Sequence, residues 1–290
     1  MNFGITLPNF GRYADKDEIL KIAASAEELG FESLWVSDHV VIPDSHEGFG
    51  DVFYDPFITL TYVAANTRNI SLGTSVIILP YRNPMVLAKM TSTLDVLSEG
   101  RVILGVGAGW LQKEFEALGV PFRERGEMAN EYIKVLKILW TEDNPSFRGK
   151  YIQFSGIKFS PKSFKTLRPP IWIGGGSDKA IERAVSLGDG WHPVGLTPEE
   201  LKEKLVYADK LLKEHNKDNF QISLRRNLEI TDKDISLGDT LRGPIEKIIS
   251  GIKEYKALGV NHLILHFLSG TSEGVLNAMR IFSKEIRPLI

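Results

Sequence analysis

Short apolar segments alternate with amphipathic segments along nearly the whole chain, and this rhythm constrains the fold more than any other feature. Eight apolar segments have the length of a strand: 2–8, 32–37, 70–79, 101–110, 169–176, 190–195, 220–230 and 260–268. Each is followed by a segment with helical periodicity: 15–30, 54–67, 83–100, about 124–140, 178–188, 198–215, 243–258 and about 272–285. Because parallel strands need helical crossovers, the alternation predicts an α/β protein.

The number of strand–helix units narrows the architecture. Eight units in 290 residues favour a closed (β/α)8 barrel, a TIM barrel, over a doubly wound open sheet. Residues 144–168 break the rhythm with turn-rich sequence, which we interpret as an insertion made of a hairpin and a loop. No linker or shift in composition divides the chain, so we expect a single domain over residues 1–290.

Composition excludes several classes of function. The formal net charge of -2 gives no reason to expect binding to nucleic acid or to an anionic membrane. The chain has no cysteine, which excludes disulfides, thiolate metal sites and a cysteine nucleophile. Residues 1–11 lack a basic region and a long apolar run, so we expect no signal peptide, and the absence of cysteine fits a cytoplasmic protein.

Polar residues and glycines gather where the predicted strands end. In (β/α)8 enzymes the chemistry lies at these carboxyl ends. The residues found there are Pro8, Asn9, Ser37, Asp38, His39, Thr74, Ser75, Gly107, Ala108, Gly109, Trp110, Gly174, Gly175, Gly176, Ser177, Trp191, His192, Arg225, Arg226, Asn227 and His266. Four of the six histidines are at strand ends or in the loops that follow: His39, His46, His192 and His266. This clustering predicts a functional site.

The glycines of Gly174 to Ser177 stand between a predicted strand and a predicted helix. Glycine lets the backbone approach a ligand closely, and N–H groups at a helix N-terminus attract anions. Lys179 and Arg183 add positive charge nearby. We favour a phosphate-binding turn, the alternative being a tight turn that binds nothing. The stretch is neither a P-loop nor a G-x-G-x-x-G fingerprint.

Asp38 and His39 interrupt an apolar run, and their role stays open at this stage. Adjacent residues on a strand point to opposite sides, and no HExxH or EF-hand pattern is present, so we expect no metal site. The pair could exchange protons with a bound substrate. It could equally be structural, with Asp38 capping the loop and His39 filling a pocket wall.

Four long motifs, in order, carry a resemblance to a known family. They are GFESLWVSDHV, LGTSVIILPYRNPMVLAKMTSTLDVLSEGRVILGVGAGWLQKEFEALG, RGEMANEYIKVLKILWTED and PPIWIGGGSDKAIERAVSLGDGWHP. The chain resembles the luciferase-like flavin and coenzyme F420 oxidoreductase superfamily over nearly its whole length. WVSDH is similar to the F420-dependent members, because FMN-dependent members more often have an acidic residue and paired histidines there.

The resemblance implies a three-ringed cofactor at the strand ends. Asp38 and His39 would border the deazaflavin ring and act in catalysis, with a cis peptide bond between Ser75 and Val76 behind the ring. Gly107 and Ala108 are also expected to contact the cofactor. The family's phosphate-binding turn corresponds to the four residues from Gly174 to Ser177.

These features predict an F420-dependent oxidoreductase that passes a hydride between the deazaflavin C5 and an organic substrate. Trp110, His192 and His266 are candidate substrate contacts, each with packing as the alternative. Family members that oxidise sugar phosphates have a catalytic glutamate where this chain has Trp110, so that reaction is doubtful here. Loops 43–53, which includes His46, and 144–168 would complete the substrate pocket, and 43–53 is a candidate lid or a surface loop.

Three other functions remain as alternatives. An FMN-dependent monooxygenase of the same superfamily would need a flavin reductase as partner and would use oxygen. A barrel lyase with a Schiff-base lysine is disfavoured, because no lysine stands at a strand end. Binding of the cofactor without turnover, as a store, is the third. The resemblance also suggests a homodimer.

Overall fold

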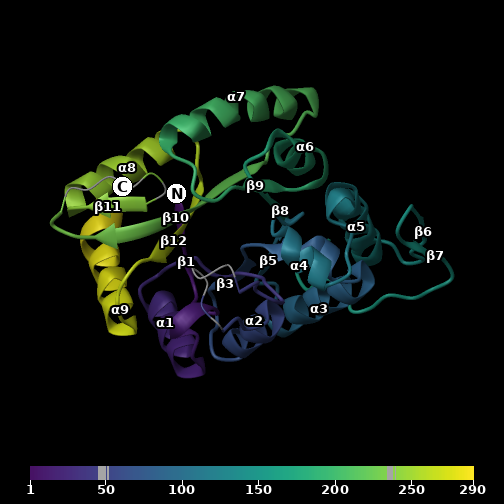
Figure 1. Cartoon of the computed structure of the whole chain (residues 1–290), viewed down its shortest axis with the longest axis horizontal. Coiled ribbons are helices and arrows are strands. Elements are labelled where there is room, and N and C mark those ends of the chain that lie inside the picture. The colour runs from purple at the N-terminus through teal and green to yellow at the C-terminus, as the bar shows by residue number, and fades with distance from the viewer. Residues whose placement is uncertain (45–49, 51, 234–237, 239) are drawn as a thin grey trace. The chain divides into compact units, whose positions relative to one another are not determined.

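The computed structural model describes residues 1–44, 50, 52–233, 238 and 240–290. It comprises two compact units (Figure 1). Unit 1 contains Met1–Pro8, Asp15–Trp35 and Trp172–Ile290, and unit 2 contains Asn9–Ala14 and Val36–Ile171. The single domain expected from the sequence stays a prediction. His46 and most of the candidate lid loop lie outside the described residues.

Unit 1 is built on a parallel sheet. Its strands are β1 (Asn2–Thr6), β2 (Ser33–Val36), β8 (Ile171–Gly174), β9 (Gly190–His192), β10 (Gln221–Ile230), β11 (Thr240–Gly243) and β12 (His262–Phe267). They pair in the order β2, β1, β12, β10, β9, β8, and β11 also pairs with β10. Only the last residue of β2 and the first of β8 belong to unit 2.

The helices of unit 1 are α1 (Lys16–Glu28), α6 (Asp178–Leu187), α7 (Pro198–Glu214), α8 (Ile245–Ala257) and α9 (Ser272–Ile281). Local sequence explains where they begin. The Asp15 side chain accepts hydrogen bonds from the N–H groups of Asp17 and Glu18, and Thr197 with Glu200 forms a capping box at α7. Helix α1 packs against α9, and α6 against α7 (Figure 1).

Unit 2 contains β3 (Ser71–Thr74), β4 (Ile77–Ile78) and β5 (Val102–Gly107), with β3 and β4 both parallel to β5. Its helices are α2 (Pro56–Ala64), α3 (Pro84–Leu97), α4 (Gln112–Ala117) and α5 (Arg125–Thr141). Helix α2 begins as the sequence predicts, with Asp55 as its N-cap and Pro56 in its first turn. An antiparallel hairpin of β6 (Phe147–Arg148) and β7 (Gln153–Phe154) confirms the insertion.

All eight predicted strands are present, with three corrections. The segment 70–79 forms two strands, β3 and β4, and the peptide bond between Ser75 and Val76, which lies between them, is cis. Strand β9 ends at His192 instead of residue 195, since Pro193 has no N–H to continue the ladder. Strand β11 was not predicted, because only two of its four residues are buried and it shows no apolar run. Among the described residues, no helix is long and apolar enough to cross a bilayer.

Candidate functional site

Asp38 lies at the carboxyl end of β2 in unit 2, where it forms a buried ion pair. Its Oδ2 accepts hydrogen bonds from Arg82 Nη1 at 2.6 Å and from the Ile78 N–H at 2.9 Å, and its Oδ1 accepts one from Arg82 Nη2 at 2.8 Å. Burial raises the pKa of Asp38, whereas the Arg82 guanidinium and the Ile78 N–H act against that rise. The carboxylate therefore ties the end of β2 to β4 and to the segment that follows.

His39 forms a second buried polar contact, with Glu114 of α4. The Nδ1 atom of His39 lies 2.7 Å from Glu114 Oε2, and Tyr81 donates its hydroxyl to the same oxygen at 3.0 Å. Glu114 Oε1 accepts the N–H groups of Val40 at 2.7 Å and Val41 at 3.2 Å. Glu114 is fully buried, yet burial, which raises its pKa, is outweighed by these hydrogen bonds, so its pKa is lowered.

The charge of Glu114 assigns the proton on His39. A carboxylate that is ionised only accepts hydrogen bonds, so Nδ1 of His39 must carry a hydrogen toward Glu114. In the neutral ring, Nε2 is then the atom able to accept a proton. This arrangement resembles that of a histidine oriented by a carboxylate for acid–base chemistry.

Aromatic side chains surround His39. Phe53 meets its ring edge-on with centroids 5.2 Å apart, and Trp110 does so at 6.2 Å. Trp110 is 55% exposed, so ordinary core packing does not account for it. The structure thus brings together His39 and Trp110, two of the predicted site residues, and Trp110 forms an apolar wall beside the imidazole.

The glycines after β5 have a packing role. A Cβ atom at Gly105 would lie 1.9 Å from the Thr74 carbonyl oxygen, and one at Gly107 would lie 2.8 Å from Val76 Cγ2. Strand β5 therefore approaches the Ser75–Val76 segment so closely that only glycine fits. The structure confirms the cis peptide bond expected there. Cofactor contacts of Ser75, Val76, Gly107 and Ala108 stay predictions.

In unit 1, the residues from Gly174 to Ser177 lead from β8 into α6, as the sequence predicts. Ser177 is the N-cap, and its Oγ accepts the Ala180 N–H at 3.3 Å. Gly175 has φ +110, a conformation that side chains rarely adopt, and Trp191 donates its indole N–H to the Gly175 carbonyl at 2.8 Å. Gly175 and Ser177 are exposed, so this end of α6 is accessible to a ligand.

The other predicted histidines in unit 1 are bonded to hydroxyl groups. His192 Nδ1 lies 2.6 Å from Ser223 Oγ, and His266 Nδ1 lies 2.6 Å from Thr6 Oγ1. Burial is the main cause that lowers the pKa of His192 to about 3 and that of His266 to about 4. His192 is fully buried and stacks on Trp35 with ring centroids 5.1 Å apart, whereas His266 is only half-buried. Their contacts with substrate stay predictions.

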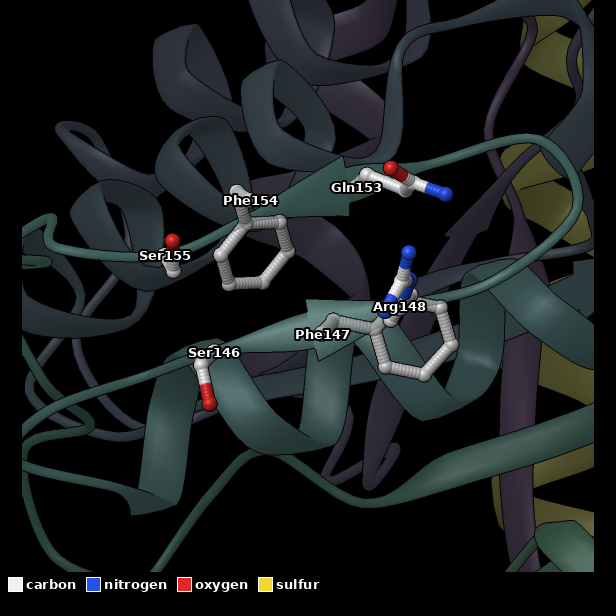
Figure 2. Close-up of a pocket in the computed structure, with 6 residues that line it drawn as sticks. All are labelled: Ser146, Phe147, Arg148, Gln153, Phe154 and Ser155. Carbon is white, nitrogen blue, oxygen red and sulfur yellow. The ribbon is translucent and has the colours of Figure 1, made fainter.

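Within the described residues, no group of three or more histidine and acidic side chains could hold a metal ion. A pocket of about 550 Å³ lies at the β6–β7 hairpin, where Phe147 and Phe154 stack with centroids 6.3 Å apart (Figure 2). All six lining residues lie in the segment 144–168, which the sequence predicts to border the substrate pocket, although none was singled out as a site residue.

The sequence interpretation missed Glu114, Tyr81, Arg82 and Ser223. A signal existed for Glu114, which falls on the same helical face as Leu111 and Leu118. A carboxylate on an otherwise apolar face must find buried hydrogen-bond donors. No comparable local signal marks Arg82, whose partner Asp38 is 44 residues away in the chain.

Comparisons with known proteins agree with this architecture. The family model for luciferase-like monooxygenases matches residues 1–262, and the chain belongs to that family. An F420-dependent glucose-6-phosphate dehydrogenase of Amycolatopsis mediterranei is 35% identical over 201 residues, which cover 67% of this chain and 57% of the relative. An F420-dependent glucose-6-phosphate dehydrogenase of Kineococcus radiotolerans is 33% identical over 178 residues, which cover 60% of this chain and 51% of the relative. The matches thus span little more than half the length of these enzymes.

Solved structures establish the fold. A monooxygenase, RslO1 of Streptomyces bottropensis, matches with a TM-score of 0.87 at 20% identity over 99% of both chains. An F420-dependent secondary alcohol dehydrogenase matches with a TM-score of 0.85 at 21% identity, over 99% of this chain and 98% of that one. The FMN-bound oxygenating component of a Pseudomonas putida diketocamphane monooxygenase matches with a TM-score of 0.82 at 16% identity. The match covers 99% of this chain and 98% of that one. The predicted (β/α)8 barrel is confirmed.

Proposed function

We propose that the protein is an F420-dependent oxidoreductase that transfers a hydride between the deazaflavin and an organic substrate. The observation that carries the proposal is the 35% identity to an F420-dependent glucose-6-phosphate dehydrogenase. The bound deazaflavin would supply the hydride chemistry at its C5, while the protein supplies binding, orientation and proton transfer.

The turn before α6 fits the phosphate of such a cofactor. Helix α6 has ten residues, and the positive end of its dipole faces the accessible Gly175, Gly176 and Ser177. A Cβ at Gly176 would find its nearest neighbour, Leu196 Cδ2, only at 3.6 Å, so the turn has room beside its backbone. We infer that these residues hold the phosphate.

The residues of unit 2 would serve the ring and the proton. In the proposed reaction, His39 takes a proton at Nε2 from a substrate hydroxyl, and Glu114 stabilises the imidazolium that results. Asp38 has both oxygens engaged, so we infer that it acts by fixing the backbone of β4 in place. Trp110 would exclude water beside His39.

A paired titration with F420 and FMN, read by fluorescence, tests the proposal. We expect saturable binding of F420 at micromolar concentration and weaker binding of FMN. Tight binding of FMN with substrate-dependent oxygen uptake would instead establish the alternative, an FMN-dependent monooxygenase supplied by a reductase. Structural likeness to enzymes of both kinds does not choose between them.

We also propose a homodimer, working in the cytoplasm. Helices α2 and α3 expose apolar side chains on neighbouring surfaces of unit 2, with Ile58 71% and Val86 55% exposed. Light scattering should give about twice the 32.5 kDa chain mass. Ile58→Glu should yield a monomer, and an unchanged mass in that variant would place any interface elsewhere.

A further inference from the structure

Strand register places several polar side chains on one face of unit 1. Strands β10 and β12 pair Ser223 with His262, Arg225 with Ile264 and Asn227 with His266. Side chains alternate along a strand, and paired residues of parallel strands point to the same face. Arg225, Asn227 and His266 therefore share a face.

Two further contacts extend that face. Strand β1 pairs Gly4 with Ile264, so Thr6 follows on the same side, which agrees with its contact with His266. Ser223, two residues before Arg225, bonds His192 of β9. We call Thr6, Arg225, Asn227 and His266 the mouth cluster.

The mouth cluster lies where the face opens to solvent. Ser223 and His192, on the amino-terminal side of it, are fully buried. Arg225 is half-buried, and Val194, which bridges to it from beyond the end of β9, is 54% exposed. A ligand entering from the carboxyl ends of these strands would therefore meet Arg225 before it met the buried histidines.

The mouth cluster is positively charged. His192 and His266 are neutral at pH 7, because burial and the charge of Arg225 keep their pKa values at about 3 and about 4. Burial lowers the pKa of Arg225 to about 10, which still leaves it protonated at pH 7. The side chains of Thr6, Asn227 and His266 add neutral polar groups around this charge.

Arg82 and Arg226 donate hydrogen bonds to groups of the fold itself. Arg82 is paired with Asp38 and also lies 3.3 Å from an oxygen of Asp55. Arg226, the neighbour of Arg225, points to the other face of β10 and donates to the carbonyls of Gly195 and Gly238. Arg225 points to the opposite face of β10 from Arg226, beside the neutral polar groups of the mouth cluster.

We propose that the mouth cluster is a subsite for an anionic group of the substrate, a carboxylate or a phosphate held by Arg225. This inference rests on the proposed oxidoreductase function and names the class of its substrate. A guanidinium matches such groups with two parallel hydrogen bonds. In the tautomer in which Thr6 donates its hydroxyl to Nδ1, His266 would offer its Nε2 hydrogen to the same anion, and the Asn227 amide would be a further donor.

Calorimetric titration with inorganic phosphate, without cofactor, tests the subsite. We expect Arg225→Gln to weaken phosphate binding at least about tenfold, because hydrogen bonds to charged groups are the stronger kind. Arg225→Lys should keep most of the binding. Asn227→Asp keeps Arg225 but places a carboxylate beside it, and this variant should also bind phosphate about tenfold more weakly. Arg280→Gln, which removes an exposed arginine of α9 that pairs with Glu273, is the matched control and should leave this binding unchanged.

Other outcomes would overturn the proposal. The proposal fails if the unchanged protein does not bind phosphate. It also fails if Ser177→Ala abolishes phosphate binding while Arg225→Gln keeps it. F420 fluorescence titration separates the cofactor's own anionic groups, because equal weakening of F420 and phosphate by Arg225→Gln would assign Arg225 to the cofactor. If the unchanged protein binds phosphate through Arg225 but does not bind F420, only the proposed function fails.

Discussion

The strand ends of unit 2 and unit 1 handle buried polar groups in opposite ways. In unit 2 the carboxylates are paired with basic side chains, Asp38 with Arg82 and Glu114 with His39. In unit 1 the histidines of the sheet contact hydroxyl groups, His192 that of Ser223, His266 that of Thr6 and His262 that of Ser33. Unit 2 therefore keeps fixed charges in place, whereas unit 1 keeps its imidazoles neutral.

This difference has a functional consequence. Ionised partners hold His39 in one tautomer, which suits proton transfer. The histidines near Arg225 stay neutral at pH 7, and Arg225 carries the charge of the subsite proposed for an anion. The difference between the two units also predicts that they respond differently to mutation and to pH.

Removing one side of the Asp38–Arg82 pair should have the largest effect. We expect Asp38→Ala to lower the free energy of unfolding by about 3 kcal/mol, because the mostly buried charge of Arg82 then keeps only its longer contact with Asp55. Urea unfolding measures this. The control is Asp17→Ala in the exposed pair with Lys16, which should change stability by less than about 0.5 kcal/mol. Similar losses in both variants would contradict the comparison.

Glu114→Gln should lower the free energy of unfolding somewhat less, by about 2–3 kcal/mol. The glutamine amide keeps the shape of the glutamate side chain but loses the charge that strengthens its hydrogen bonds. Glu116→Gln on the exposed side of α4 is the matched control. Because the pKa of Glu114 is lowered in the fold, its contribution should be complete above the ordinary pKa of 4.5. It should disappear as pH falls through the lower folded value. A variant as stable as the control would show that the carboxylate is not needed.

His192 should make unit 1 sensitive to pH. The unfolded state takes up a proton near pH 6.5 but folded His192 only near pH 3, so stability is complete above 6.5 and falls as pH decreases toward 3. His192→Asn should flatten the dependence of the unfolding free energy by up to about 1.4 kcal/mol per pH unit between about pH 4 and 6. Between about pH 7.5 and 8.5 both proteins should show the same slope. Equal slopes below pH 6 would mean that His192 is charged in the fold.

Ser33→Ala should have the smallest effect, about 1–2 kcal/mol. The Ser33 hydroxyl accepts the Trp35 indole N–H at 2.7 Å and lies 2.6 Å from Nε2 of His262, all within the core of unit 1. Ser186→Ala on the exposed side of α6 is the matched control and should be nearly neutral. Equal effects on thermal unfolding would show that the buried hydroxyl contributes nothing specific.

Much of the fold could be predicted from sequence, because its signals are local. Periodicity marked the eight strands and most helices, and Asp55 before Pro56 marked where α2 begins. The hairpin in the insertion was also expected, and the structure has it. The split of segment 70–79 into β3 and β4 could not be read from the sequence, because apolar residues stand on both sides of the break.

The sequence by itself determined the alternation that makes a barrel, the positions of most strand-end residues and the motifs of the family. Only the tertiary structure decided which of those residues meet. Arg82 reaches Asp38 across 44 residues, and Glu114 reaches His39 across 75. The protonation of Glu114 and His192 depends on burial and on partners brought from distant strands and helices, which no local pattern of residues encodes.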